Sequence, residues 1–135
     1  MRKKILFVDD ENDWRFMASM FLKESGYDVL TARDGTDALL KSEGVKLDLI
    51  LLDVDLAGED GVASMKFLKR SHPDVPIILY TGVVHDQQAI QSMLKAGAFQ
   101  YLRKGTMEEL MHVVQTAVGS PGDNSRSIEK SPQPK

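Results

Sequence analysis

Short apolar runs that each lead into a polar residue restrict the folds open to this chain more than any other feature. The runs occupy residues 5–8, 49–52, 77–80 and 99–102, and the polar residues after them are Asp9, Asp10, Asp53, Thr81 and Lys104. Runs of this length that are rich in Ile, Leu and Val are typical of strands buried on both faces, as in parallel sheets. The carboxyl ends of parallel strands share one edge, where open α/β sheets bind ligands. We therefore expect the five polar residues at one edge of a sheet.

Segments with the apolar spacing of amphipathic helices separate the strands. The pattern predicts helices near residues 11–25, 35–42, 62–71, 86–96 and 106–118, and strands near residues 4–8, 28–32, 48–52, 76–80 and 99–102. In the first helix, one apolar core stripe is expected at Trp14, Met17, Ala18, Phe21 and Leu22. Strands and helices that alternate in this way form a parallel sheet with helices on both faces.

The length and composition indicate one folded domain and a polar tail. A chain of 135 residues with 42% hydrophobic content can bury one core and little more. Residues 119–135 contain Ile128 as their only large apolar residue. We therefore expect a folded domain over residues 1–118 and a flexible polar tail or linker over residues 119–135.

The composition also argues against several kinds of site and partner. The absence of cysteine excludes disulfides and thiolate metal sites. No apolar stretch approaches the roughly 20 residues that cross a membrane, and no secretory segment follows the first residue, so we expect a cytoplasmic protein. The net charge of −3 gives no reason to expect nucleic-acid binding.

Three carboxylates, a hydroxyl and an ammonium at one sheet edge suggest a site for a divalent metal ion and a phosphoryl group. Carboxylate oxygens are ligands for hard divalent ions, and a lysine can hold a phosphoryl oxygen as a point charge. Each residue also has an ordinary interpretation. Asp9 and Asp10 could cap a helix, Lys104 could be a surface lysine, and Thr81 could simply end a strand. These separate interpretations do not explain the joint arrangement.

The histidines and several methionines show no pattern of their own. The three histidines lie far apart in the sequence and are expected at the surface: His72, His85 and His112. Four methionines have the spacing of helix core positions and are expected to pack there: Met17, Met93, Met107 and Met111.

The chain from about residue 3 to residue 118 resembles the receiver domain of bacterial two-component response regulators. The resemblance rests on the acidic pair Asp9-Asp10 after the first strand, Asp53 after the third, Thr81 after the fourth and Lys104 after the fifth. Two further matches are Tyr101, three residues before the lysine, and Gly61, eight residues after Asp53. One such match is weak, but this set in this order is highly specific.

The resemblance implies a fold and a role for each site residue. The fold is a flavodoxin-like, doubly wound, five-stranded parallel sheet of order 2-1-3-4-5 with five helices. Asp53 is the expected phosphoacceptor, whose carboxylate attacks phosphorus to form an acyl phosphate. Mg²⁺ is the expected ion, bound by Asp10, Asp53 and the backbone carbonyl of Asp55, while Asp9 acts on the metal's water shell or on the position of Asp10.

Lys104 and Thr81 are expected to bind the phosphoryl group. Thr81 and Tyr101 are then expected to shift and to change the surface of the fourth helix, fifth strand and fifth helix, as in a two-state population shift. The chain would thus be a signalling phosphoacceptor rather than an enzyme with a separate substrate.

The resemblance also implies the class of partner. A sensor histidine kinase or a histidine phosphotransfer protein would donate the phosphoryl group, and a phosphorylation-dependent homodimer is compatible with the family. Phe16 and Met20 lie opposite the core stripe of the first helix and four residues apart, so we expect an exposed patch that docks the phosphodonor protein. The alternative interpretation is two scattered surface residues.

The chain departs from the family pattern at two positions, and two other functional classes stay open. Ala57 and Gly105 stand where the family commonly has proline. The segment Asp53-Val54-Asp55 also resembles the motif of haloacid-dehalogenase-type phosphotransferases, in which the second acid is a general acid/base. The other class is an interaction module that is never phosphorylated. Turnover of a free phosphomonoester would support the dehalogenase-type class. A phosphodonor assay would distinguish the interaction module, which would not be phosphorylated.

Overall fold

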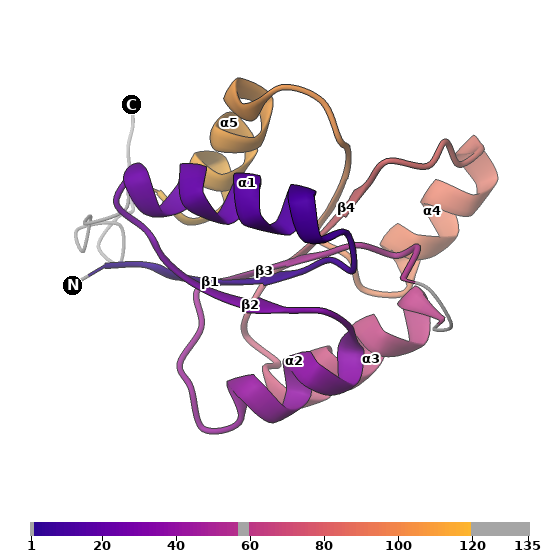
Figure 1. Cartoon of the computed structure of the whole chain (residues 1–135). Coiled ribbons are helices and arrows are strands. Elements are labelled where there is room, and N and C mark those ends of the chain that lie inside the picture. Colours follow the sequence, from indigo (N-terminus) through magenta and orange to yellow (C-terminus); the bar gives the residue numbers. More distant parts are fainter. Residues whose placement is uncertain (1, 57–59, 120–135) are drawn as a thin grey trace, which may run out of the picture.

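The computed structural model describes residues 2–56 and 60–119, and these form a single parallel sheet covered by helices on both faces (Figure 1). The strands are β1 (Lys4–Val8), β2 (Asp28–Ala32), β3 (Leu49–Leu52), β4 (Ile77–Thr81) and β5 (Gln100–Arg103). Their order across the sheet is β2-β1-β3-β4-β5, and all four neighbouring pairs are parallel. The expected fold class and strand order are therefore confirmed.

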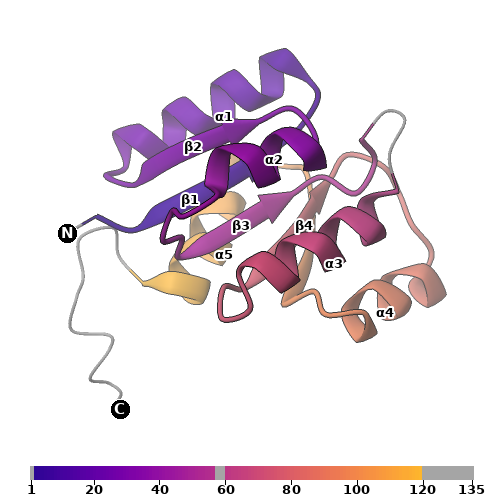
Figure 2. The same ribbon diagram turned by 90° about the horizontal axis from the view of Figure 1, so that it is seen from below.

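The helices are α1 (Asn12–Glu24), α2 (Gly35–Ser42), α3 (Gly61–Ser71), α4 (Gln87–Lys95) and α5 (Met107–Val118). One face of the sheet packs against α1 and α5, and the opposite face packs against α2 and α3, as Figures 1 and 2 show from two directions. Met93 of α4 belongs to the same apolar core as α2 and α3. The helices thus lie on both faces, as the alternating pattern predicted.

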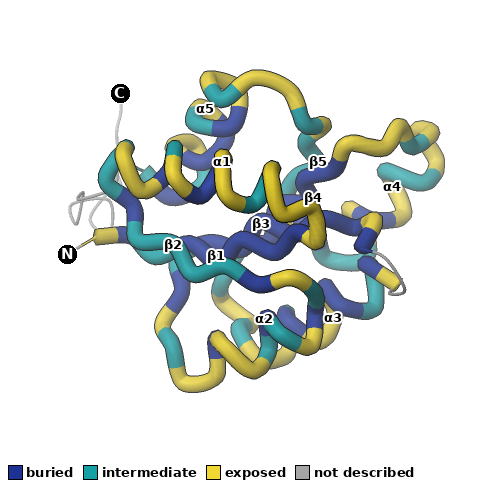
Figure 3. The backbone as a smooth tube through the Cα atoms, in the orientation of Figure 1, coloured by how far each residue is buried: buried dark blue, intermediate teal, exposed yellow. Residues whose placement is uncertain are grey.

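Alternate residues of each central strand serve the two cores. In β1, Leu6 and Val8 face the core beneath α2 and α3, whereas Ile5 and Phe7 face the core beneath α1 and α5. All of these side chains are fully buried, and dark blue, the colour of buried residues, gathers on the central strands of the tube in Figure 3. The edge strands β2 and β5 are mostly half-buried, because each has a neighbour on one side only. Burial on both faces explains why the central strands appear in the sequence as continuous apolar runs.

Most helix boundaries differ from the prediction by one residue. The predicted ranges for α1, α4 and α5 included capping residues, whereas α3 begins one residue earlier than predicted. Asp60, Asp86 and Thr106 are N-caps whose side chains accept hydrogen bonds from backbone N–H groups of the first turn. At α5, the Thr106 hydroxyl accepts from the Glu109 N–H while the Glu109 carboxylate accepts from the Thr106 N–H, each at 3.1 Å. This is a complete capping box, which stabilises the start of the helix that follows Lys104.

The predicted core stripe of α1 was wrong at one position. Met17 is 43% exposed, whereas Ser19 is buried. Ala18 and Leu22, four residues apart, point at the sheet, and this direction leaves Met17 at the margin of the buried face. Burial of Ser19 is tolerated because its hydroxyl donates to the Phe16 carbonyl at 3.1 Å.

Two predictions fall on residues that the structure does not describe. Ala57 lies in the undescribed segment 57–59, and the predicted tail lies almost entirely within residues 120–135. Across residues 2–56 and 60–119, no helix combines the length and the apolar character that crossing a membrane requires.

Candidate functional site

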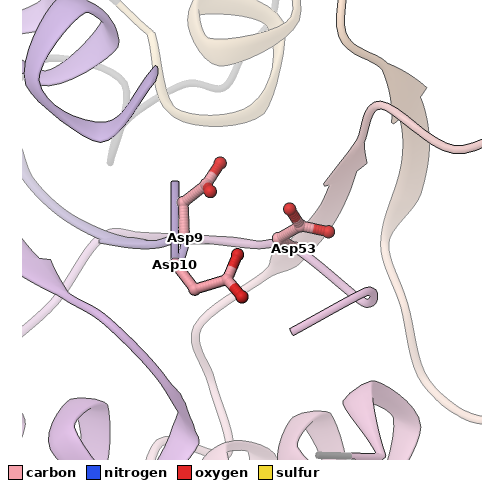
Figure 4. A group of neighbouring side chains, drawn as sticks. All are labelled: Asp9, Asp10 and Asp53. Carbon is pink, nitrogen blue, oxygen red and sulfur yellow. The ribbon is translucent and has the colours of Figure 1, made fainter. Parts of the chain in front are cut away.

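Three aspartates meet beyond the carboxyl ends of β1 and β3. One carboxylate oxygen from each of Asp9, Asp10 and Asp53 lies within 4.8 Å of the other two (Figure 4). The strand register explains this arrangement, because Val8 pairs with Leu52 and the next residues therefore leave the sheet side by side. Asp9 is fully buried and Asp53 is 5% exposed, whereas Asp10 is exposed. Three carboxylates that converge in this way can bind a hard divalent cation.

Lys104, from the loop after β5, supplies the positive charge of the site. Its Nζ lies 2.8 Å from Asp9 Oδ2, 2.9 Å from Glu11 Oε1 and 3.3 Å from Asp53 Oδ2. The Lys104 side chain is only 7% exposed, so its contacts with Asp9 and Asp53 are largely shielded from water, whereas the Glu11 side chain is 67% exposed. Glu11 was not predicted as a site residue, although an acid directly after the pair Asp9-Asp10 was a visible signal.

The surroundings of Lys104 hold its side chain in place. Its backbone N–H donates to the Thr81 carbonyl at 2.7 Å, which extends the pairing of β4 and β5 by one residue. Its Nζ lies 5.2 Å from the centre of the Trp14 ring, within the range of a cation–π contact. The peptide bond between Lys104 and Gly105 is trans.

Burial and charge change the protonation equilibria of the buried groups. Burial raises the pKa of Asp53 and of Asp9, and the hydrogen bonds and positive charge that each carboxylate receives oppose this rise. Burial would lower the pKa of the Lys104 ammonium, but the contacts with Asp9 and Glu11 outweigh it and raise the pKa above its usual value. Lys104 is therefore a permanent cation beside two carboxylates that are more basic than usual.

Thr81 is the last residue of β4 and is fully buried. Its hydroxyl donates to Asp55 Oδ2 and accepts from the Val83 N–H at 3.1 Å. The Asp55 N–H in turn donates to Asp53 Oδ1 at 2.9 Å. The sequence pointed only to the backbone carbonyl of Asp55, and the contact of its carboxylate with Thr81 was not predicted.

Two of the three histidines are not the surface residues that we expected. The His85 side chain is only 16% exposed, with Nε2 3.4 Å from Asp55 Oδ1 and Nδ1 2.6 Å from the Tyr101 hydroxyl. The segment after β4 brings His85 back against β5, where Tyr101 is the register partner of Leu79. His72 is half-buried, with Nε2 3.0 Å from the Ser42 hydroxyl. His112 is exposed, as predicted.

Gly61 has a steric role beside the site. A Cβ atom at this position would lie 2.3 Å from the carbonyl oxygen of Val54, the residue after Asp53. Real Cβ atoms essentially never approach another atom so closely. The glycine at the start of α3 therefore lets this helix pack directly against the loop that carries Asp53 and Asp55.

Comparison with known proteins agrees with this geometry. The family model for the response regulator receiver domain matches residues 5–115. Over 104 residues, the chain is 41% identical to the alkaline phosphatase synthesis transcriptional regulatory protein PhoP of Bacillus subtilis, covering 77% of this chain and 43% of that protein. The chain thus spans less than half the length of that relative.

Two solved structures are similar in fold. A CheY-like receiver domain protein from Methanospirillum hungatei has a TM-score of 0.80 and 26% identity, over 87% of this chain and 94% of that chain. The response regulator TrrA from Thermotoga maritima, solved in complex with Mg²⁺ and a beryllium fluoride, has a TM-score of 0.75 and 32% identity, over 85% of this chain and 98% of that chain.

Proposed function

Because this chain belongs to the family of response regulator receiver domains, which act as phosphoacceptors, we propose that Asp53 is its phosphorylated residue. The position of the Asp53 carboxylate carries this proposal. One oxygen accepts from the Asp55 N–H at 2.9 Å, and the other lies 3.3 Å from Lys104 Nζ. A phosphoryl group on Asp53 would therefore form beside a buried ammonium that is already in place.

The transfer needs a nucleophile, charge neutralisation and a leaving group. An Asp53 oxygen attacks phosphorus and forms the acyl phosphate bond, while the bond from phosphorus to the donor breaks and its electron pair leaves with the donor. Lys104 neutralises charge on the phosphoryl oxygens. Thr81 would donate its hydroxyl hydrogen to one of these oxygens once it exchanges its present acceptor, Asp55.

We propose Mg²⁺ as the ion of the site, bound by Asp10, Asp53 and the backbone carbonyl of Asp55. The donor set fits, because one carboxylate oxygen from each of Asp9, Asp10 and Asp53 lies within 4.8 Å of the other two. When bound, the ion would neutralise charge on the phosphoryl oxygens. Both oxygens of Asp9 already have partners, since Oδ1 accepts from the Glu11 N–H at 2.8 Å and Oδ2 contacts Lys104. This favours the expected indirect role for Asp9. The complex of TrrA with Mg²⁺ supports the choice of ion.

The phosphoryl group would come from a sensor histidine kinase or a histidine phosphotransfer protein in the cytoplasm. Receiver domains of response regulators accept phosphoryl groups from histidine kinases. Phe16 and Met20 of α1 are 67% and 41% exposed, and we propose that they dock this donor. Thr81 and Tyr101 would then change the surface formed by α4, β5 and α5, where a homodimer partner or an effector could bind.

The contacts of Asp55 argue against the dehalogenase-type alternative. In that class, the second acid of the motif must reach the leaving group as a general acid/base. Here one Asp55 oxygen accepts from Thr81 and the other faces His85. We therefore propose a signalling phosphoacceptor that catalyses only its own phosphorylation and dephosphorylation.

An intact-mass measurement tests the proposal. Incubation with Mg²⁺ and acetyl phosphate should add one phosphoryl group to the parent protein and none to Asp53→Asn, because the amide keeps the shape of the side chain but is not a nucleophile. Asp74→Asn, which changes an exposed aspartate in the loop before β4, is the matched control and should be phosphorylated like the parent. Phosphorylation of the Asp53→Asn protein would contradict the assignment, and an unmodified parent would favour the interaction module.

A further inference from the structure

A continuous chain of side-chain contacts joins the Asp53 loop to Tyr101. It begins at Asp55, whose N–H donates to Asp53 and whose carboxylate accepts from Thr81. The other oxygen of this carboxylate lies 3.4 Å from His85 Nε2. On the opposite side of the imidazole ring, Nδ1 lies 2.6 Å from the Tyr101 hydroxyl. His85 is therefore the one side chain in this chain of contacts that touches both Asp55 and Tyr101.

The packing of His85 makes this link well defined. Its side chain is 16% exposed, and its ring meets the Tyr101 ring edge-on at 86°, with 5.7 Å between the ring centres. The Tyr101 hydroxyl also lies 3.3 Å from the Val83 carbonyl, in the same segment after β4. A ring held by an aromatic contact and by two polar partners has few alternative positions. A movement of Asp55 would therefore change the position of His85 and its contact with Tyr101.

We propose that His85 is a positioning residue that couples the occupation of Asp53 to the position of Tyr101, through the contacts Asp55–His85–Tyr101. This inference rests on the proposed phosphorylation of Asp53. It adds a second connection to Tyr101 besides the hydroxyl of Thr81, and it gives the Asp55 carboxylate a function in the response of the domain.

Electrostatics supplies the driving force for the coupling. A phosphoryl group on Asp53 adds negative charge next to the Asp55 carboxylate and offers Thr81 a new acceptor. Asp55 then loses the hydrogen bond from Thr81 and is repelled by the new charge. When Asp55 moves, His85 Nε2 loses its fixed partner, and the hydrogen bond of Nδ1 with Tyr101 changes with it.

The substitution His85→Phe isolates this link. Phenylalanine keeps a flat ring that can pack on Tyr101, but it removes both nitrogens and therefore both polar contacts. His112→Phe is the matched control, because His112 is an exposed histidine on α5 and the exchange of residue types is identical. His85→Leu is a second variant, which removes the ring and both polar contacts.

Beryllofluoride with Mg²⁺ is the probe, because it mimics a phosphoryl group and is not hydrolysed. The fluorine NMR signal of bound beryllofluoride reports occupation of the site. The ring NMR signals of the three tyrosines, with Tyr101 assigned through Tyr101→Phe, report the response. We expect saturation to displace the Tyr101 signal in the parent and in His112→Phe. His85→Phe and His85→Leu should bind beryllofluoride but lose most of this displacement.

The outcomes separate the two proposals. A Tyr101 displacement in His85→Phe as large as in the parent, at equal occupation, would overturn the coupling and leave phosphorylation of Asp53 intact. If His85→Phe does not fold, His85→Leu decides in the same way. A parent protein that neither binds beryllofluoride nor is modified by acetyl phosphate would instead overturn the proposed function. Unchanged free-state signals of Tyr27 and Tyr80 would show that the lost response is not a general loss of structure.

Discussion

The packing of α3 against the Asp53 loop predicts that Gly61→Ala will destabilise the domain and disturb its site. A Cβ atom at residue 61 would lie 2.3 Å from the carbonyl oxygen, 2.4 Å from the Cα and 2.6 Å from the carbonyl carbon of Val54. Ordinary van der Waals contact begins at 3.4 Å, and all three atoms belong to the backbone. No side-chain rotation can relieve this overlap, so either the helix or the loop must move.

The expected loss follows from two opposing terms. Overpacking of a well-packed interior costs typically about 1–3 kcal/mol, and the upper part of this range applies because backbone atoms must shift. The better helix propensity of alanine would return up to about 1 kcal/mol, although residue 61 is only the first residue of α3. We therefore expect the free energy of unfolding to fall by about 1–3 kcal/mol.

Urea unfolding, followed by the fluorescence of Trp14, measures this loss. Trp14 is the only tryptophan and packs against Tyr80 in the core, with 6.2 Å between the ring centres. Gly82→Ala is the matched control, because its Cβ would meet only Lys104 Cδ, at an ordinary 3.5 Å. We expect the control to stay within about 0.5 kcal/mol of the parent.

The same substitution should slow phosphorylation by acetyl phosphate, because Val54 connects Asp53 with Asp55. Equal unfolding midpoints for Gly61→Ala and Gly82→Ala, with equal slopes of free energy against urea, would refute the steric argument. A destabilised Gly61→Ala protein that is phosphorylated at the parent's rate would show that α3 moves and the loop does not.

Three further predictions concern the metal, the pH dependence and the docking surface. Asp10→Ala should weaken Mg²⁺ binding in calorimetry, because it removes a carboxylate ligand; an affinity equal to that of the parent would exclude Asp10 as a ligand. Burial lowers the pKa of His72 in the folded protein. As the pH falls, the imidazole of His72 is therefore protonated in the unfolded chain before it is protonated in the folded one. The free energy of unfolding should consequently fall as the pH falls below about 6.5. Urea unfolding at pH 7.5 and 5.5 should therefore show a smaller loss in His72→Gln than in the parent, and an equal loss would contradict the assignment. The double variant Phe16→Ser, Met20→Ser should slow transfer from the cognate kinase but not from acetyl phosphate, while Phe67→Ser, an exposed aromatic residue on α3, should change neither; slowing of both reactions by the double variant would remove the support for docking.

The sequence by itself determined the elements and most of the residues of the candidate site. Central strands buried on both faces appear as continuous apolar runs, and amphipathic helices appear as stripes, because both patterns depend on residues close in the chain. The ends of β1 and β3 then placed Asp9, Asp10 and Asp53 together, as the parallel arrangement required. The order of the strands came from the resemblance to receiver domains, since periodicity alone does not distinguish among parallel orders.

Only the tertiary structure decided which partner each polar group has. Thr81 and Asp55 are 26 residues apart, and Lys104 and Glu11 are 93 residues apart. Such pairs are set by how the crossover helices bring the strand ends and loops together in space. The sequence showed three acids at the sheet edge, but not that Asp9 would be buried against Lys104 while Asp10 stays exposed.

The burial of His85 and the exposure of Met17 have the same cause. Both depend on the direction in which a segment lies over the sheet: α1 turns Met17 outward, and the segment after β4 turns His85 inward between Asp55 and Tyr101. The spacing of apolar residues along the sequence indicates which residues can share a face of a helix or segment. Packing against distant strands decides how far that face is rotated toward the core.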